Sequence, residues 1–518
     1  MSVTTFISLP EDLHIRILAE LNGKSIIRCA MTCKTLYETL RNSLVLEYRI
    51  QLYLDGLEDA GTSTSSASSL ISDLRRYREA CFTQEWSGFV KTSGLSSRYD
   101  NRYDDDHKLG GGVISVTDGD HLEIVRLPNA KTGEGLVTIE HNLSTEGVTV
   151  FCMDPTQDVM AILERVNSQK EDLGGLDGYL RDLCIYIRTL STNTDHPLAN
   201  TGVLWFADVS DGYDEETIHN PKLEISDDNL VLWTCDYTPR VIIWDWKTGE
   251  CLRDLNFNAR VAYGPCRVIP PDVHDFGLLG SSDFAFLTRP TGCGSIEIYR
   301  LAFRRHLATL NFPSYTPGTT VKSLTIKSYN NSVYKHQASY GPFLVNNEEQ
   351  IYVFEVEYEY SAIARNQPLA DVPWNAWGPA NTAIDILYPT YGPKPIHGQR
   401  VICRTPDDGV EMKDFTLSAV LAADGGQSIV SLGESKPAGV LIRSNTIRAA
   451  EVPIFLNDVE GRLPYVSYLL TGRPMGKTTN YSMVMMCEEG VVCTVSSDDD
   501  DGDDIERNQI YIYSPVAL

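Results

Sequence analysis

One segment combines the glycine, lysine and threonine residues that phosphate-binding loops use. It covers residues 471–479 (TGRPMGKTT). Such a loop needs four residues between its two glycines, whereas Gly472 and Gly476 are separated by three, so the spacing favours a polar turn between strands. The run Gly110 to Gly112 precedes an apolar segment typical of a strand, which is the wrong context for a dinucleotide-binding loop. We interpret that run as a flexible lead-in to the strand.

Two groups of side chains have the chemistry of metal ligands. Cys29 and Cys33 lie four residues apart on a predicted helix, but a tetrahedral site needs two further ligands, and the sequence places none beside them. Asp498 to Asp501 supply oxygen donors for a weak Ca²⁺ site, without the spacing or the final glutamate of an EF-hand. The favoured interpretations are structural thiols and a solvated acidic loop. We therefore expect no metal, no cofactor and no catalytic residues.

The composition excludes several classes of function. In 518 residues, 70 acidic and 44 basic side chains give a formal net charge of -26. A surface this negative repels phosphate backbones and anionic lipids, so we expect neither nucleic acid nor a membrane as a partner. No apolar stretch reaches the roughly 18 to 20 residues of a membrane-spanning helix.

The first residues and the cysteines favour an intracellular protein, in the cytoplasm or the nucleus. The N-terminal segment lacks a basic region, and Pro10, Glu11 and Asp12 interrupt its apolar residues, so it does not resemble a signal peptide. The 12 cysteines are scattered without paired short spacings, as is typical of reduced thiols.

The first 60 residues predict two or three short helices. Their apolar side chains recur at gaps of three and four residues, which places them on one helix face: Leu13, Ile17, Leu21, Ile26, Ile27, Ala30, Met31, Leu36 and Leu40. Ser8 and Glu11 have the spacing of a capping box, and Ser25 is a candidate cap for the second helix, after the break at Asn22-Gly23. We expect His14, on the first helix, to be a surface contact.

A change of character follows near residue 60. Residues 61–72 (GTSTSSASSLIS) are rich in serine and threonine and are interpreted as a flexible linker. Residues 73–86 (DLRRYREACFTQEW) return to helical spacing, with Arg75, Arg76 and Arg78 as polar positions. We predict one amphipathic helix there.

From about residue 86 onward, the sequence predicts strands. Short runs of β-branched and aromatic residues, such as VIIWDW (241–246) and IYVFEV (351–356), alternate with turn residues. Similar runs are centred on Ile124, Ile185, Ile243, Ile298, Val353, Ile402, Ile442 and Ile512. A repeat of roughly 40 to 60 residues, each with several short strands, is typical of a β-propeller.

One repeat is more specific. Residues 230–252 read LVLWTCDYTPRVIIWDWKTGECL, with a strand that ends at Trp244-Asp245 and a turn at Lys247-Thr248-Gly249. This segment resembles the end of a WD-repeat blade, although the usual upstream Gly-His pair is absent and the other repeats lack the Trp-Asp pair. The resemblance implies a degenerate WD-like propeller.

The N-terminal segment 9–40 (LPEDLHIRILAELNGKSIIRCAMTCKTLYETL) resembles the F-box. The resemblance implies that this segment docks onto the Skp-type adaptor of a cullin–RING ubiquitin ligase. The residues that it assigns to adaptor binding are Leu9, Pro10, Glu11, Leu13, Ile17, Leu18, Leu21, Ile26 and Ile27. Further matches are Arg28, Cys33 and Lys34.

Three positions depart from the usual pattern of that family. Asn22-Gly23 replaces Asp-Pro, Thr32 replaces a small apolar residue, and Leu36 replaces a tryptophan, which removes a large aromatic contact. The physical chemistry agrees with docking, because so many apolar residues in so short a helical unit cannot all bury against one another. The alternative is that these helices pack on the β-domain.

The expected fold is therefore a small all-α F-box followed by an all-β propeller with seven or eight irregular blades. We place the F-box at 1–55, the linker and amphipathic helix at 56–85, and the propeller at 86–518. Two Pro-rich aromatic loops of the propeller are candidates for contact with a substrate. Their aromatic residues are Trp374, Trp377, Tyr388 and Tyr391.

These features predict the substrate-recognition subunit of a cullin–RING ubiquitin ligase of the SCF type, without catalytic residues of its own. Its partners would be the Skp-type adaptor, the cullin scaffold and a protein substrate. One alternative is an F-box scaffold protein that acts outside ubiquitination. Another is a propeller enzyme with carboxylates or histidines in a central pocket, because propellers serve many functions.

Overall fold

The computed structural model places helices at the N-terminus and β-sheets after them. The residues that it describes are 6–61, 63–83, 88–96, 107–118, 121–127, 137–143, 148–166, 180–209, 221–234, 240–256, 273–279, 283–288, 294–300, 305–314, 319–327, 343–345, 351, 353–360, 374–383, 396–405, 410–425, 438–448, 457–470, 481–487, 490–495 and 507–514. Every structural statement below concerns these residues.

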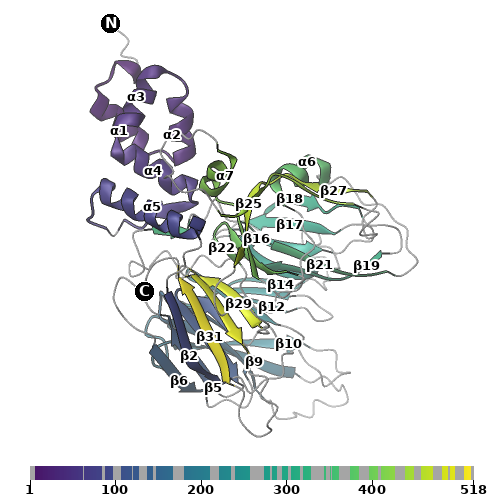
Figure 1. Ribbon diagram of the computed structural model, residues 1–518. Coiled ribbons are helices and arrows are strands. Elements are labelled where there is room, and N and C mark those ends of the chain that lie inside the picture. Colours follow the sequence, from purple (N-terminus) through teal and green to yellow (C-terminus); the bar gives the residue numbers. More distant parts are fainter. Residues whose placement is uncertain are drawn as a thin grey trace.

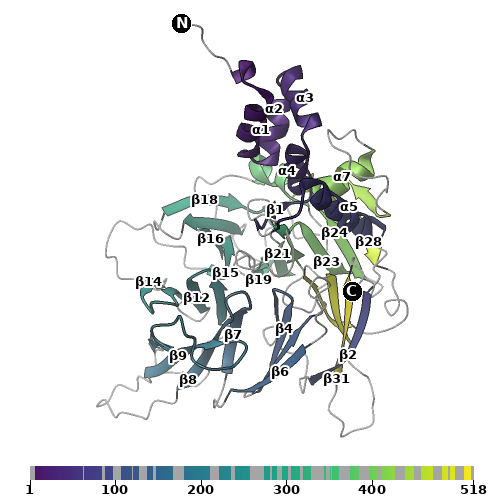
Figure 2. The same ribbon diagram turned by 90° about the vertical axis from the view of Figure 1, so that its left-hand side faces the viewer.

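Four short helices form the N-terminal module, after a single turn η1 (Phe6–Ser8). They are α1 (Glu11–Ala19), α2 (Gly23–Ala30), α3 (Lys34–Asn42) and α4 (Leu44–Leu54). One face of each helix contributes to a shared core, which contains Leu18, Ile26, Ala30, Leu36, Leu40, Leu46, Ile50 and Leu54. Figures 1 and 2 show α1, α2 and α3 on the side of the module that points away from the sheets.

The caps of these helices differ from the sequence prediction. Pro10 is the N-cap of α1 without a side-chain cap, so Ser8 and Glu11 do not form the predicted capping box. The side chain of Asn22, not of Ser25, caps α2, because its Oδ1 accepts a hydrogen bond of 2.9 Å from the Ser25 backbone N–H.

Gly23 has a packing role that explains the Asn-Gly pair. A Cβ atom at this position would lie 2.3 Å from the Cβ atom of Tyr53 on α4, which is too close for any side chain. The glycine therefore allows α2 to approach α4 closely.

The helix α5 (Ala67–Thr83) begins earlier than predicted. It includes Ala67 to Ser72, which the sequence analysis interpreted as part of a flexible linker. Leu70, Ile71 and Leu74 are buried and pack with Tyr48 and Leu52 of α4, and this packing extends the helix into the serine-rich segment.

Besides two short strand pairs, the described residues form seven antiparallel sheets. The first sheet contains β3 (His107–Gly110), β4 (Val113–Asp118), β5 (His121–Arg126) and β6 (Val137–Asn142). The second contains β7 (Val148–Asp154), β8 (Val159–Val166), β9 (Leu180–Thr189) and β10 (Val203–Val209). The third contains β11 (Lys222–Ser226), β12 (Asn229–Thr234), β13 (Arg240–Asp245) and β14 (Cys251–Asn256).

The fourth sheet contains β15 (Val273–Leu279), β16 (Asp283–Thr288), β17 (Ser295–Arg300) and β18 (Arg305–Asn311). The fifth pairs β19 (Thr319–Lys327) with β21 (Val353–Tyr360). The sixth has the order β22 (Ile396–His397), β23 (Arg400–Arg404), β24 (Val410–Asp414), β28 (Tyr465–Leu470), β25 (Val440–Ile442). The seventh has the order β2 (Gly88–Ser96), β31 (Arg507–Ser514), β30 (Gly490–Val495), β29 (Tyr481–Cys487).

These sheets follow one another as the blades of a propeller. The first strands of neighbouring sheets lie in contact from β29 to β3, from β3 to β7 and from β7 to β11, and likewise from β15 to β19 and from β22 to β29. The Lys222 Nζ atom, on β11, lies 2.5 Å from Asp275 Oδ1 on β15, which links the third and fourth sheets. Val353 packs with Ile396 and Val401, which links the fifth and sixth. The ring is closed by β2, which comes from the start of the domain and pairs with β31 from its end.

Seven sheets agree with the predicted seven or eight blades, and the sixth sheet explains the ambiguity. The runs around Ile402 and Ile442 were separate markers of the sequence repeat, yet they form β23 and β25 of the same sheet. The helix α7 (Leu417–Asp424) and the hairpin β26 (Asn445–Ile447) and β27 (Val459–Gly461) are inserted between its strands.

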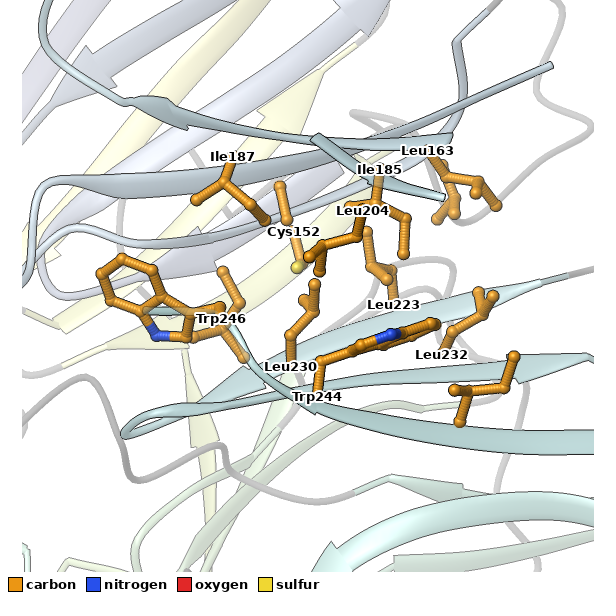
Figure 3. Packing of buried hydrophobic residues seen from close by; sticks show 14 of the residues in the cluster. Cys152, Leu163, Ile185, Ile187, Leu204, Leu223, Leu230, Leu232, Trp244 and Trp246 are labelled. Atoms are coloured by element: carbon orange, nitrogen blue, oxygen red, sulfur yellow. The ribbon is translucent and has the colours of Figure 1, made fainter. Parts of the chain in front are cut away.

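Two of the predicted local features lie in these sheets. Gly111 and Gly112 form the turn between β3 and β4, with φ values of 56° and 66°, so this run is a tight hairpin turn and not a flexible lead-in. In the WD-like segment, Trp244 lies in the core between the second and third sheets (Figure 3), and Asp245 Oδ1 accepts hydrogen bonds from the backbone N–H groups of Lys247 and Thr248.

Candidate functional site

Large apolar side chains are exposed on the N-terminal module although it has its own core. They are Phe6, Ile7, Leu13, Ile17, Met31, Tyr37, Leu44 and Val45. Leu13 and Ile17 are 40% and 44% exposed and lie one turn apart on α1, so they share one side of this helix. The turn η1, with Phe6 and Ile7, adjoins the first turn of α1. We call Phe6, Ile7, Leu13 and Ile17 the N-terminal apolar surface.

The predicted adaptor-binding residues fall into three groups. Four of them are exposed: Pro10, Glu11, Leu13 and Ile17. Three are half-buried: Leu9, Leu21 and Ile27. Leu18 and Ile26 are buried in the core of the module, so they stabilise its helices from inside and offer no side chain to a partner.

Sequence reasoning missed Phe6, Ile7, Tyr37, Leu44 and Val45. Phe6 and Ile7 precede the predicted first helix, and Leu44 and Val45 lie at the start of α4 beyond the matching segment. The signal that could have found them is an excess of apolar residues over what four short helices can bury.

Leu36 lies inside the module and not on its surface. Its side chain is 5% exposed and packs in the core, whereas the neighbouring Tyr37 is 40% exposed. The change from tryptophan to leucine at this position therefore alters the interior of the module and not its exposed surface.

His14 is also buried, contrary to the expectation of a surface contact. It is 2% exposed, its Nε2 atom lies 2.8 Å from the Phe6 carbonyl oxygen, and its ring centroid lies 4.9 Å from that of Phe6. The histidine therefore joins η1 to α1.

The module is joined to the propeller through both faces of α5. Toward the module, Arg78 donates hydrogen bonds to both carboxylate oxygens of Asp55, at 2.9 and 2.6 Å, and to Gln51 Oε1 at 2.7 Å. These side chains of Arg78 and Asp55 are 1% and 3% exposed. The helical spacing predicted Arg78 only as a polar position, and its burial is not visible in that pattern.

Toward the propeller, α5 packs on the sixth sheet. Arg400 donates hydrogen bonds to Tyr77 Oη at 3.1 Å and to Asp414 Oδ2 at 2.9 Å. Burial raises the pKa of the Tyr77 hydroxyl, so Tyr77 stays neutral. Burial lowers the pKa of the Arg400 guanidinium, but Asp414 raises it, and the net result lies well above the usual value. Phe82, at the end of α5, lies in the core of the sixth sheet.

Two smaller contacts reinforce this joint. The strand β1 (Leu57–Asp59), directly after the module, pairs with β20 (Phe343–Val345). Leu421 of α7 packs against the core of the module. As the alternative of packing on the β-domain predicted, α4 packs toward the propeller, because its Tyr48 and Leu52 pack with Phe343 of β20. The helices α1 to α3 point away from the propeller (Figure 2).

Two of the four candidate substrate contacts lie among the described residues. Trp374 is half-buried at the start of α6 (Trp374–Asn381), so this segment is a helix and not the predicted loop. Trp377 also lies in α6. Tyr388 and Tyr391 lie outside the described residues, as do the segments 471–479 and 498–501.

Within the described part of the chain, no group of histidine, cysteine and acidic side chains has the arrangement of a metal site. No helix of that part is long and apolar enough to cross a membrane.

Comparison with known proteins identifies the module. The F-box domain family matches residues 6–48. A comparison with curated proteins finds no significant match.

Several solved propellers align with the chain at low similarity. The C-terminal WD40 domain of Sif2 is 10% identical with a TM-score of 0.30, over 82% of this chain and 99% of that one. The Dos1 propeller is 8% identical with a TM-score of 0.31, over 79% and 78%. The WD40 domain of coronin from Toxoplasma gondii is 10% identical with a TM-score of 0.29, over 82% and 87%. The propeller assignment rests on the strand pairing of this chain and not on these scores.

Proposed function

We propose, from the F-box domain at residues 6–48, that this protein is the substrate-recognition subunit of an SCF-type ubiquitin ligase. An F-box implies a Skp-type adaptor as partner. The observation that carries the proposal is the exposure of Pro10, Leu13 and Ile17 on a helix that points away from the propeller. A partner can therefore reach these side chains without displacing the sheets.

The proposed contribution of the chain is proximity and not chemistry. A protein substrate bound to the propeller and an adaptor bound to the module would be held in one assembly, which raises the effective concentration of the substrate near the ligase. The buried joint around Arg78 and Arg400 supports this role, because it fixes the module relative to the sixth sheet. The cullin scaffold, an intracellular location and Trp374 as a substrate contact belong to the same proposal.

The test is adaptor binding by the full chain. The variant Leu13→Asp/Ile17→Asp places two charges on the N-terminal apolar surface, and we expect at least about a tenfold loss of affinity for a purified Skp-type adaptor, because each buried apolar side chain contributes about 1.5–3 kcal/mol. The matched control is Leu198→Asp, since Leu198 is equally apolar and 58% exposed, but lies on the propeller.

Equal binding by all three proteins would contradict this docking surface. Recovery of the adaptor without any cullin, when the full-length chain is purified from cells, would instead favour the scaffold alternative. The two outcomes are distinguishable because the adaptor and the cullin are quantified separately.

A further inference from the structure

We infer that His14 is a positioning residue that holds the turn η1 in place, so that Phe6 and Ile7 add to the surface that contacts the adaptor. This inference rests on the proposed function and deepens it. It concerns a histidine that neither the F-box pattern nor the sequence spacing assigns to docking.

The turn η1 needs lateral support because it is only three residues long. A single 3₁₀ turn is marginal in isolation, since nucleating a turn fixes several dihedral angles for one hydrogen bond. Pro10 follows and favours an extended conformation for Leu9, so the turn cannot gain stability by continuing directly into α1.

The Phe6 carbonyl oxygen receives this support from two directions. The Leu9 backbone N–H donates to it at 3.1 Å, within the turn itself. The His14 Nε2 atom lies 2.8 Å from it, and because a carbonyl oxygen only accepts hydrogen bonds, Nε2 must carry a proton. His14 thus connects α1 to the turn across eight residues.

The aromatic rings add a second contact. The centroids of Phe6 and His14 are 4.9 Å apart with an interplanar angle of 52°. Phe6 covers the histidine, which is 2% exposed, while 38% of Phe6 and 53% of Ile7 remain exposed. One side of the turn is therefore anchored and the other is available to a partner.

The occupant that this surface fits is the adaptor of the proposed function. Phe6 and Ile7 adjoin the exposed Pro10 and the helix that carries Leu13 and Ile17, so a partner that binds α1 meets the turn as well. Holding these side chains in place before binding reduces the conformational entropy that docking would otherwise cost.

The experiment measures the affinity of the full chain for a purified Skp-type adaptor. His14→Leu keeps an apolar side chain but removes the donor, and we expect binding about 3- to 10-fold weaker, the fold-change that corresponds to one hydrogen bond. His14→Gln keeps an N–H donor and should recover part of the loss. The control Ile50→Val alters the core of the N-terminal module at a position away from η1.

A double-mutant cycle separates positioning from simple stability. In the background Phe6→Ala/Ile7→Ala, the change His14→Leu should cost little further affinity, because the side chains that it positions are gone. Hydrogen exchange of the peptide that contains residues 6–13 should also be faster in His14→Leu, while exchange in α4 stays unchanged.

Unchanged affinity in His14→Leu, or a loss that simply adds to that of Phe6→Ala/Ile7→Ala, would overturn this inference and leave the proposed function intact. A native chain that does not bind the adaptor would overturn the proposed function as well.

Discussion

Adjacent side chains of α1 differ in their environment, and in the proposed function they therefore differ in their roles. Ile17 is 44% exposed and Leu18 is 2% exposed, although both are aliphatic and adjacent. Successive positions on a helix differ by about 100° in direction, so only one of them can face the core. The sequence pattern predicts one apolar face on this helix, but the choice between Ile17 and Leu18 depends on where α2 and α4 pack.

Substitutions at these two positions should therefore affect different properties, stability at Leu18 and adaptor binding at Ile17. Leu18→Ala is expected to lower the free energy of unfolding by about 2–5 kcal/mol, because it leaves a cavity in the core of the module. Ile17→Ala should change stability by less than about 0.5 kcal/mol but should weaken adaptor binding. Chemical unfolding and adaptor titration of both variants check this. Equal loss of stability would contradict the division.

His397 makes a second prediction at the scale of the residue. It lies on β22, at the inner edge of the sixth sheet, and burial lowers its pKa to about 3, with a smaller contribution from Arg400. The unfolded chain therefore binds the proton more readily than the folded chain between about pH 6.5 and pH 3, so stability falls as the pH drops through that range.

At one pH unit below the histidine pKa of 6.5 in the unfolded chain, the free energy of unfolding is lower by about 1.4 kcal/mol. His397→Asn should remove this part of the pH dependence, which chemical unfolding of both proteins at pH 7.5 and pH 5.5 would measure. An identical pH dependence in the two proteins would exclude His397 as its source.

At the scale of the element, α5 shows what helical spacing can and cannot predict. The spacing of the apolar positions predicts a helix correctly, but it does not distinguish Arg78 from the other arginines of the helix. Arg78 is buried because Asp55 and Gln51, more than 20 residues earlier, meet it at the end of α4. Partners so distant in sequence are not visible in a local pattern, and the same holds for the start of the helix at Ala67.

The ion pair in this joint predicts a specific pattern of stability. Arg78→Met leaves the Asp55 carboxylate buried without its guanidinium partner, and the expected cost is about 3–5 kcal/mol. Adding Asp55→Asn removes the remaining charge and should restore part of that loss. Chemical unfolding of the native chain and of the single and double variants tests this. A double variant less stable than Arg78→Met would contradict the account.

At the scale of the whole molecule, the propeller could be predicted from the repeated runs of strand residues. The way in which its ring of sheets closes could not be predicted from them. The first four runs each mark the third strand of a sheet, β5, β9, β13 and β17. The later spacing drifts because α7 and the hairpin β26–β27 are inserted into the sixth sheet. Closure by β2 depends on pairing between the two ends of the domain, which no local pattern reveals.

Contacts between residues far apart in the sequence also join the N-terminal helices to the propeller. The predicted division at residue 86 separates strands from helices, but Phe82 already lies in the core of the sixth sheet, and β1 pairs with β20. The F-box was predicted from local spacing alone, and the F-box domain family matches residues 6–48. The contacts of α5 that join the N-terminal helices to the sheets could not be predicted in this way, because their partners are far apart in the sequence.

The central claim is that this chain connects a substrate to a cullin–RING ligase through its F-box. The most direct measurement is affinity purification of the full-length protein from cells, beside Leu13→Asp/Ile17→Asp and Leu198→Asp, with quantification of the adaptor and the cullin by mass spectrometry. We predict that both partners are recovered with the native chain and with Leu198→Asp, and that both are lost with the α1 variant while its melting temperature is unchanged. Recovery of the cullin in equal amounts with all three proteins, or with none of them, would contradict the claim.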